Sequence, residues 1–242
     1  MHTIHRFPSI LTVLAAAALL LHACQSSAPA TGDSIGTVTR EQDLVEQGAS
    51  PEGLRPVDGT NPLFEGDTLK VSEGGEGLLD FGDKLVVRLF NDSQVGLIST
   101  SAPGTPLGVR LFLERGGFTG RLDEDGGQAV FETPGGANIT VLGTQFFLVY
   151  NASQQMSTIG NYDGQVQLDT AAGIIPLQPG HYVDWPSGQM PGQQIPIPVT
   201  IGQFEQWARQ DQSPSSAVER MRTVSRPAAT MPILAMSTVP FR

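Results

Sequence analysis

Few residues of this 242-residue chain could carry acid–base or metal chemistry. It has four histidines, and three of them (His2, His5 and His22) lie near the N-terminus, which leaves His181 alone in the rest of the chain. Zinc sites and Ser-His-Asp triads need several partners, and no His-Glu-x-x-His, Gly-x-Ser-x-Gly or P-loop pattern occurs. The sequence therefore predicts no catalytic, metal-binding or cofactor-binding residue, and a protein that is not an enzyme.

Clustered carboxylates offer the remaining chemistry. Asp123, Glu124 and Asp125 are consecutive and precede two glycines. An EF-hand calcium loop would need a distal glutamate, which this segment lacks, so we expect a hairpin turn with solvated charges. A glycosidase needs two carboxyl groups that face each other about 5–9.5 Å apart. Sequence spacing cannot establish such a pair, so a carboxylate-based hydrolase stays as an alternative.

The charge balance excludes one class of partner. The chain has 24 acidic and 14 basic residues, a formal net charge of -10. A protein that binds nucleic acid needs a basic face for the phosphates, so no nucleic-acid partner is expected. Tyr182 and Trp185 could form a stacking surface for a sugar ring, although packing in the core is the expected role of this pair.

The only cysteine, Cys24, follows a segment typical of a secretion signal. Residues 10–21 are apolar apart from Thr12, and this run is shorter than the about 20 residues of a membrane span. Leu21-His22-Ala23-Cys24 resembles the lipobox of bacterial lipoproteins. This resemblance implies a signal peptide over 1–23, lipidation at Cys24, membrane lipid as a partner, and an extracytoplasmic, lipid-anchored location. The membrane would be the outer one if the source is Gram-negative.

The elements beyond the cysteine follow from composition and periodicity. Residues 24–60 are polar with scattered glycine and proline, which predicts a flexible tether. From 61 to 188, apolar residues alternate over short runs such as Val109–Leu113, separated by glycine-rich turns. This pattern predicts an all-β domain, a β-sandwich or roll of about 10–13 short strands, with a β-solenoid as the alternative.

One short C-terminal helix is expected within a linker over 189–211. Thr200 and Gln203 fit a capping box at its start. Three apolar residues then share one helical face: Phe204, Trp207 and Ala208. Residues 212–242 contain further prolines and scattered methionines and are expected to be a disordered tail.

A series of short motifs runs through the β region. Its residues are Gly66, Asp67, Gly117, Phe118, Thr133, Pro134, Leu142, Gly143, Thr144, Phe146, Gly164, Val166 and Gly180. In this order they resemble the FecR domain of bacterial envelope proteins, most strongly in the Leu-Gly-Thr-x-Phe stretch at Leu142–Phe146. His181 stands where that family usually has glutamine.

The resemblance implies that these residues build the domain rather than bind a ligand. Its glycines would occupy strand reversals that need positive φ, and Leu142–Thr144 would form a β-bulge. Four aromatic residues are expected in the core: Phe81, Phe118, Phe131 and Phe146.

The resemblance also bears on function. The name-giving member of the family is a transmembrane sensor that relays a receptor signal to a sigma factor, whereas this chain has a lipoprotein-type signal. The sequence therefore indicates a membrane-tethered, non-enzymatic sensor, adaptor or binding module that contacts an envelope protein or polymer. A carbohydrate- or peptidoglycan-binding module is the alternative.

Overall fold

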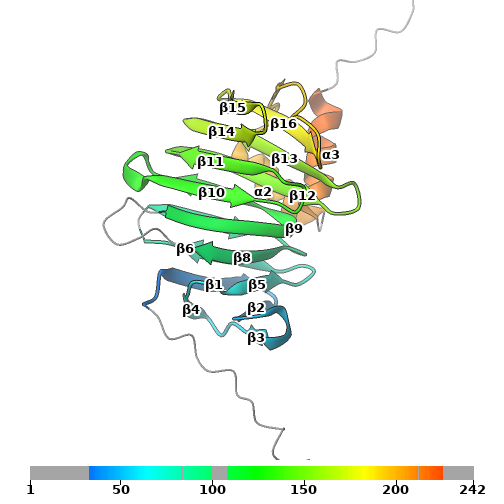
Figure 1. Cartoon of the computed structure of the whole chain (residues 1–242). Helices are drawn as coiled ribbons and strands as arrows, with labels where there is room; N and C mark the ends of the chain where they lie inside the picture. The colour runs from blue at the N-terminus through cyan, green and yellow to red at the C-terminus, as the bar shows by residue number, and fades with distance from the viewer. Residues whose placement is uncertain (1–32, 83, 100–107, 212, 226–242) are drawn as a thin grey trace, which may run out of the picture. The chain divides into compact units, whose positions relative to one another are not determined.

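The structure is a computed structural model that describes residues 33–82, 84–99, 108–211 and 213–225. Two β-sheets stack against each other, and two helices lie against one of them (Figure 1). The all-β domain predicted from the sequence is confirmed. The described residues form seventeen strands, and several have only two to four residues.

The first sheet is antiparallel throughout, and nine strands follow one another across it. In spatial order they are β4 (Thr60–Leu63), β1 (Gly36–Gln42), β6 (Glu76–Asp80), β7 (Leu85–Leu89), β9 (Gly108–Leu122), β12 (Thr144–Asn151), β13 (Met156–Asn161), β16 (His181–Pro186) and β17 (Ile195–Pro196).

The second sheet also has nine strands, and it shares the long strand β9 with the first. In spatial order they are β3 (Arg55–Pro56), β2 (Val45–Gly48), β5 (Thr68–Val71), β8 (Gln94–Ser99), β9, β10 (Gln128–Glu132), β11 (Asn138–Leu142), β14 (Gln165–Thr170) and β15 (Gly173–Leu177). Only the β9–β10 pair is parallel among them.

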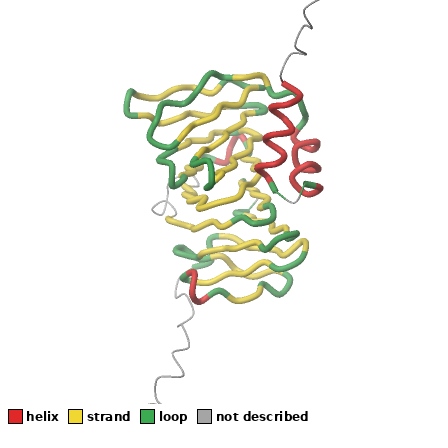
Figure 2. The backbone as a smooth tube through the Cα atoms, turned by 90° about the vertical axis from the view of Figure 1, so that its right-hand side faces the viewer, coloured by secondary structure: helices red, strands yellow, loops and turns green. Residues whose placement is uncertain are grey.

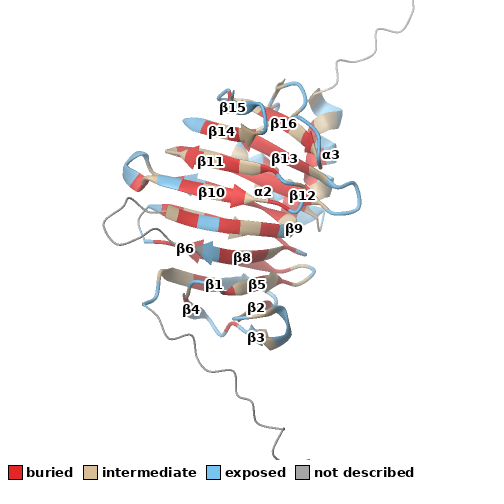
Figure 3. Ribbon diagram, viewed as in Figure 1, coloured by how far each residue is buried: buried red, intermediate tan, exposed pale blue. Residues whose placement is uncertain are grey.

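The main core lies between the two sheets because the strands alternate. In β7, Leu85, Val87 and Leu89 are fully buried, while Val86 and Arg88 between them face outward. Figure 3 shows this alternation of buried and more exposed positions along the strands. The aromatic residues Phe81, Phe118, Phe131 and Phe146 all lie in this core, as the sequence predicts.

The N-terminal strands correct the predicted tether. Within the described part of 24–60, β1, β2 and β3 are paired into the sheets. Val38, Val45 and Val57 are fully buried. Strands β1 and β2 each bury a single valine among polar residues, and Val57 directly follows β3. The apolar alternation that reveals a strand is therefore missing from the sequence.

Two helices cover part of the outer face of the first sheet, as Figure 2 shows. The predicted helix is α2 (Ile201–Gln210), and Thr200 and Gln203 form its capping box. The second is α3 (Pro214–Ser225), which corrects the predicted disordered tail over its described part. The helices and the sheet share a second apolar cluster: Phe90, Phe147, Val149, Tyr182, Phe204, Ala208, Ala217, Val218 and Met221.

All four edge strands of the two sheets contain proline. These residues are Pro62 in β4, Pro196 in β17, Pro56 in β3 and Pro176 in β15. Proline has no N–H group to donate to a further strand, so it blocks pairing at an exposed edge. The free surfaces of the domain are therefore its faces rather than its edges.

Candidate functional site

The predicted lipidation site lies outside the described residues. Cys24 and the predicted signal peptide over 1–23 both precede residue 33, the first residue that the structure describes. Among the described residues, neither helix is long and apolar enough to span a membrane. The anchor predicted from the lipobox therefore stays a prediction.

The motif residues near the start of the domain lie at a turn. Gly66 has a φ of 85° between β4 and β5. Asp67 is only 4% exposed, and its Oδ2 accepts hydrogen bonds from the Phe64 N–H at 2.9 Å and from Gln47 Nε2 at 2.6 Å. Asp67 therefore joins this turn to strand β2.

Further motif residues lie in the interior of the domain. The ring of Phe118 is 5.2 Å from that of Phe131 and 6.1 Å from that of Phe146, measured between centroids. Gly117 leaves no room for a side chain, because a Cβ there would lie 2.9 Å from Cβ of Pro214 in α3. Thr133 and Ser157 share a buried hydrogen bond of 2.9 Å, and Pro134 follows in an exposed turn.

Gly143 marks a passage between sheets, which corrects the predicted bulge at Leu142–Thr144. Strand β11 ends at Leu142 in the second sheet and β12 begins at Thr144 in the first. One residue makes this turn, with a φ of 52°. A Cβ at Gly164 would lie 1.9 Å from the carbonyl oxygen of Gly143, so close approach of the backbones requires Gly164. A Cβ at Gly143 would lie 3.0 Å from Cα of Glu124.

The other motif residues complete this corner. Thr144 Oγ1 donates a 2.9 Å hydrogen bond to Asn161 Oδ1. Val166 is buried in β14, and Gly180 has a φ of 72° before β16. The structure places all of these residues in turns and core positions.

The residues considered for chemistry do not converge. The acidic run Asp123–Asp125 lies at the turn that carries the chain from β9 in the first sheet to β10 in the second, rather than in a hairpin. His181 Nδ1 lies 2.9 Å from the carbonyl oxygen of Pro179. Within the described ranges, no three His, Cys, Asp or Glu side chains are grouped as metal ligands.

The aromatic pair considered for sugar stacking is buried. Tyr182 is 1% exposed under the helices, whereas Trp185 is 5% exposed and belongs to the core between the sheets. Trp185 Nε1 donates a 2.8 Å hydrogen bond to the carbonyl oxygen of Gln189. The two rings therefore pack in different layers, and the core role expected for them is confirmed.

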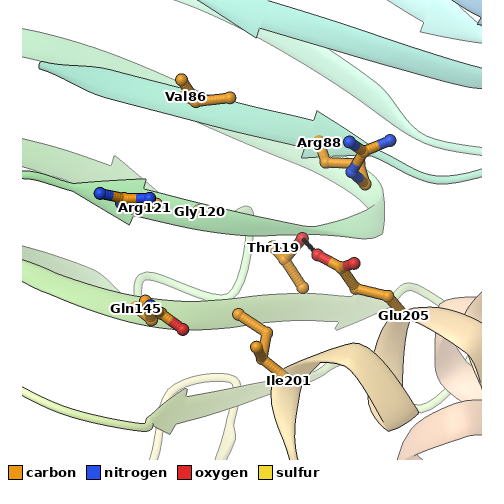
Figure 4. Close-up of a pocket in the computed structure, with 8 residues that line it drawn as sticks. All are labelled: Val86, Arg88, Thr119, Gly120, Arg121, Gln145, Ile201 and Glu205. Carbon is orange, nitrogen blue, oxygen red and sulfur yellow. Dashed lines mark hydrogen bonds between the residues drawn. The ribbon is translucent and has the colours of Figure 1, made fainter. Parts of the chain in front are cut away.

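A shallow hollow of ≈ 290 Å³ is present on the first sheet, and sequence reasoning missed it (Figure 4). It lies on the outer face beside α2. It is lined by Val86, Arg88, Thr119, Gly120, Arg121, Gln145, Ile201 and Glu205. A second hollow of ≈ 350 Å³ shares Val86 and Arg121 with the first and extends it toward Asp80, Lys84 and Asp123.

Strand register brings the lining residues together. Arg88 of β7 lies opposite Thr119 of β9, and Val86 lies opposite Arg121. Arg121 is also opposite Gln145 of β12. The only sequence signal for this arrangement is that these polar residues alternate with the buried ones, and that signal does not tell which strands are neighbours.

Glu205 and a group of ion pairs fix α2 at the border of the hollow. Thr119 Oγ1 donates a 2.8 Å hydrogen bond to Glu205 Oε1. Arg209 Nε donates to Glu76 Oε2 at 2.8 Å, and Arg88 pairs with both Glu76 and Glu41. The side chain of Glu76 is only 7% exposed.

The two arginines keep Glu76 ionised. Burial by itself would raise the pKa of its carboxyl group, but hydrogen bonds from Arg209 and Arg88 and their positive charges lower that pKa below its usual value. Burial would lower the pKa of Arg88, and its bonds to Glu76 and Glu41 raise it instead. Charged groups are thus paired at the border of the hollow.

The shape of the hollow favours a large ligand. Sites for small molecules are usually clefts that enclose most of the ligand. This depression is open and continues across three strands, with two aliphatic side chains, an amide and paired charges on its surface. Such a surface can contact a protein or polymer over several residues.

Comparison with known proteins gives little further information. No protein-family profile matches the chain, and no curated protein matches it. Two crystal structures described as a “putative anti-sigma factor” from Parabacteroides distasonis resemble it. The first has a TM-score of 0.46 and 16% identity over 58% of this chain and 63% of that chain. The second has a TM-score of 0.43 and 17% identity, over 53% and 57% of the two chains.

The matched regions span less than two thirds of those chains. Both TM-scores lie below 0.5, and neither similarity bears on function.

Proposed function

We propose that this chain is a FecR-like, extracytoplasmic protein, tethered to a bacterial membrane through Cys24, that acts as a non-enzymatic sensor or adaptor. In this proposal, an envelope protein or polymer binds on the outer face of the first sheet, in the hollow beside α2. The observation that carries the proposal is this open hollow, whose border is fixed by the Thr119–Glu205 and Glu76–Arg209 contacts.

A fixed border matters because binding loses affinity when surface groups must be ordered. The hollow lies on strands and one capped helix rather than on loops, so its side chains start from defined positions. Proline in the edge strands disfavours the addition of a further strand. This supports a partner that binds on the face of a sheet rather than along its edge.

The partner site is tested by photo-crosslinking in intact cells. A photoreactive amino acid replaces Gln145 in the hollow or, as the matched control, Gln167 on the outer face of the second sheet. Both residues are half-buried and outward-facing. We expect a discrete crosslinked product from position 145 and none from position 167. Products from both positions, or from neither, would contradict a partner in the hollow.

The tether is tested separately by fractionation. Cys24→Ala should move the protein from the membrane fraction to the soluble fraction, because lipid chains on Cys24 would supply the anchor, at about 0.8 kcal/mol for each buried methylene group. Unchanged membrane association of Cys24→Ala would refute the lipid anchor and leave the crosslinking result to be judged by itself.

A further inference from the structure

Asn91 lies in the turn between β7 and β8 and is buried to an unusual degree for an amide. The residue is only 3% exposed. Neither Oδ1 nor Nδ2 has a hydrogen-bond partner among the described residues. A buried amide without partners is costly, typically by about 1–3 kcal/mol for each lost bond, so native proteins seldom keep one unpaired.

A small cavity adjoins this amide. It measures ≈ 20 Å³. Its lining contains the polar residues Asn91, Gln42, Glu76 and Arg209, together with Gly74, Gly75 and Phe90. This volume exceeds the roughly 10–15 Å³ that one water molecule requires, and it is too small for a metabolite or a partner's side chain. The cavity is therefore of the right size for a single water, and polar side chains form part of its wall.

The charges of the lining select the occupant further. Glu76 already receives hydrogen bonds from Arg209 at 2.8 and 3.1 Å, and it also pairs with Arg88. A cation would meet the guanidinium of Arg209, and an anion would meet the carboxylate of Glu76. A neutral molecule that both donates and accepts hydrogen bonds suits all of these groups.

We infer that this cavity binds an ordered water molecule that bridges the amide of Asn91 to the Glu76–Arg209 ion pair. The water accepts from Nδ2 or donates to Oδ1 of Asn91, and it uses its remaining positions on the carboxylate and the guanidinium. It thereby connects the β7–β8 turn to helix α2, next to the ion pairs that border the hollow. This inference does not depend on the proposed function.

A high-resolution crystal structure of the full chain tests the inference directly. We expect a solvent peak within hydrogen-bonding distance of the Asn91 amide and of Glu76 or Arg209. An empty cavity, or an Asn91 amide bonded directly to protein groups, would overturn it.

Urea unfolding of Asn91→Leu gives a second test, in which the direction of the change in the unfolding midpoint decides between a water-filled and a dry cavity. If the cavity holds water, leucine removes partners of that water, and the unfolding midpoint falls. If the cavity is dry, leucine replaces an unpaired amide by an apolar side chain of similar size, and the midpoint rises. A higher midpoint would therefore refute the bridging water.

Overcrowding by leucine could also lower the midpoint, so the substitution is repeated in an Arg209→Met background. A bridging water couples the two sites, and Asn91→Leu should then lower the midpoint much less in that background. An equal fall in both backgrounds is the result of overcrowding alone and would contradict the bridge.

Discussion

Replacing Phe204 with alanine should weaken the attachment of both helices to the first sheet. Phe204 is fully buried in α2, and its ring stacks on that of Phe147 in β12, with centroids 4.4 Å apart and planes inclined by 18°. It also meets the edge of Phe90 at 6.5 Å. This one side chain therefore packs against one aromatic residue of the outer sheet face and another that directly follows β7.

The cost follows from these contacts. Replacement of a buried phenylalanine by alanine typically costs about 3–5 kcal/mol of the free energy of unfolding. The stacked pair contributes part of that figure, about 0.5–1.5 kcal/mol. Domains of this kind are usually stable by about 5–15 kcal/mol, so the loss is a large fraction of the total.

Urea unfolding followed by circular dichroism measures this loss, and Gln206→Ala on the exposed side of the same helix is the control. We expect Phe204→Ala to lower the free energy of unfolding by about 3 kcal/mol or more, and Gln206→Ala to change it by less than about 0.5 kcal/mol. A loss below about 1 kcal/mol for Phe204→Ala would show that the helices are not an integral part of the domain.

Three further predictions concern the ion pairs of Glu76, the packing of Gly160 against Phe147 and the prolines at the sheet edges. The pKa of Glu76 is lowered on folding, so the stability that the ionised carboxylate contributes is present at neutral pH and is lost as the pH falls from about 5 through its folded pKa. In a plot of urea midpoint against pH, Glu76→Gln should therefore reduce the slope on the acid side. An unchanged slope would refute the role of the ion pairs. Gly160→Ala would place a Cβ 1.9 Å from the ring of Phe147 and should lower the free energy of unfolding in urea by about 1–3 kcal/mol or more. In the control Gly202→Ala, the Cβ meets open space, and the free energy of unfolding should fall far less. Equal decreases for the two variants would contradict the packing. Pro176→Val should restore an N–H donor at the edge strand β15 and so increase aggregation on heating, measured by light scattering. Unchanged light scattering would contradict protection of that edge by proline.

The sequence reveals the central strands because their burial is periodic. In β9, Val109, Leu111 and Leu113 are buried while Arg110 between them is exposed, and this alternation is visible in the sequence. Glycines at positive φ, such as Gly66, separate the strands. Local propensity and burial agree over this region, so the all-β prediction succeeds.

The N-terminal strands and the last helix were missed for different reasons. Strand β1 buries only Val38 among its seven residues, so tertiary pairing rather than apolar pattern makes it a strand. Helix α3 begins with Pro214, which suggests a break in the sequence but is well suited to the first position of a helix. Its buried residues Pro214, Ala217, Val218 and Met221 do follow helical spacing, but a proline and an alanine are two of the four, so the apolar stripe is weak in the sequence.

The hollow could not be predicted from the sequence at all. Its lining extends from Val86 to Glu205 and depends on the register of three strands and on the docking of α2. A one-residue change of register would move Arg88 and Arg121 to the inner face. The sequence contains the outward-facing residues but not the strand neighbours that bring them together.

Accessibility of the hollow in the native envelope tests the proposed function most directly. Cys24 is the only cysteine of the chain, so single cysteines introduced at Gln145 or Gln167 can be distinguished by thiol labelling and peptide mass analysis. Both should react in the purified protein. In intact envelopes, we predict that position 145 is protected by the bound partner while position 167 still reacts. Equal labelling of the two positions in envelopes would contradict a partner on the outer face of the first sheet.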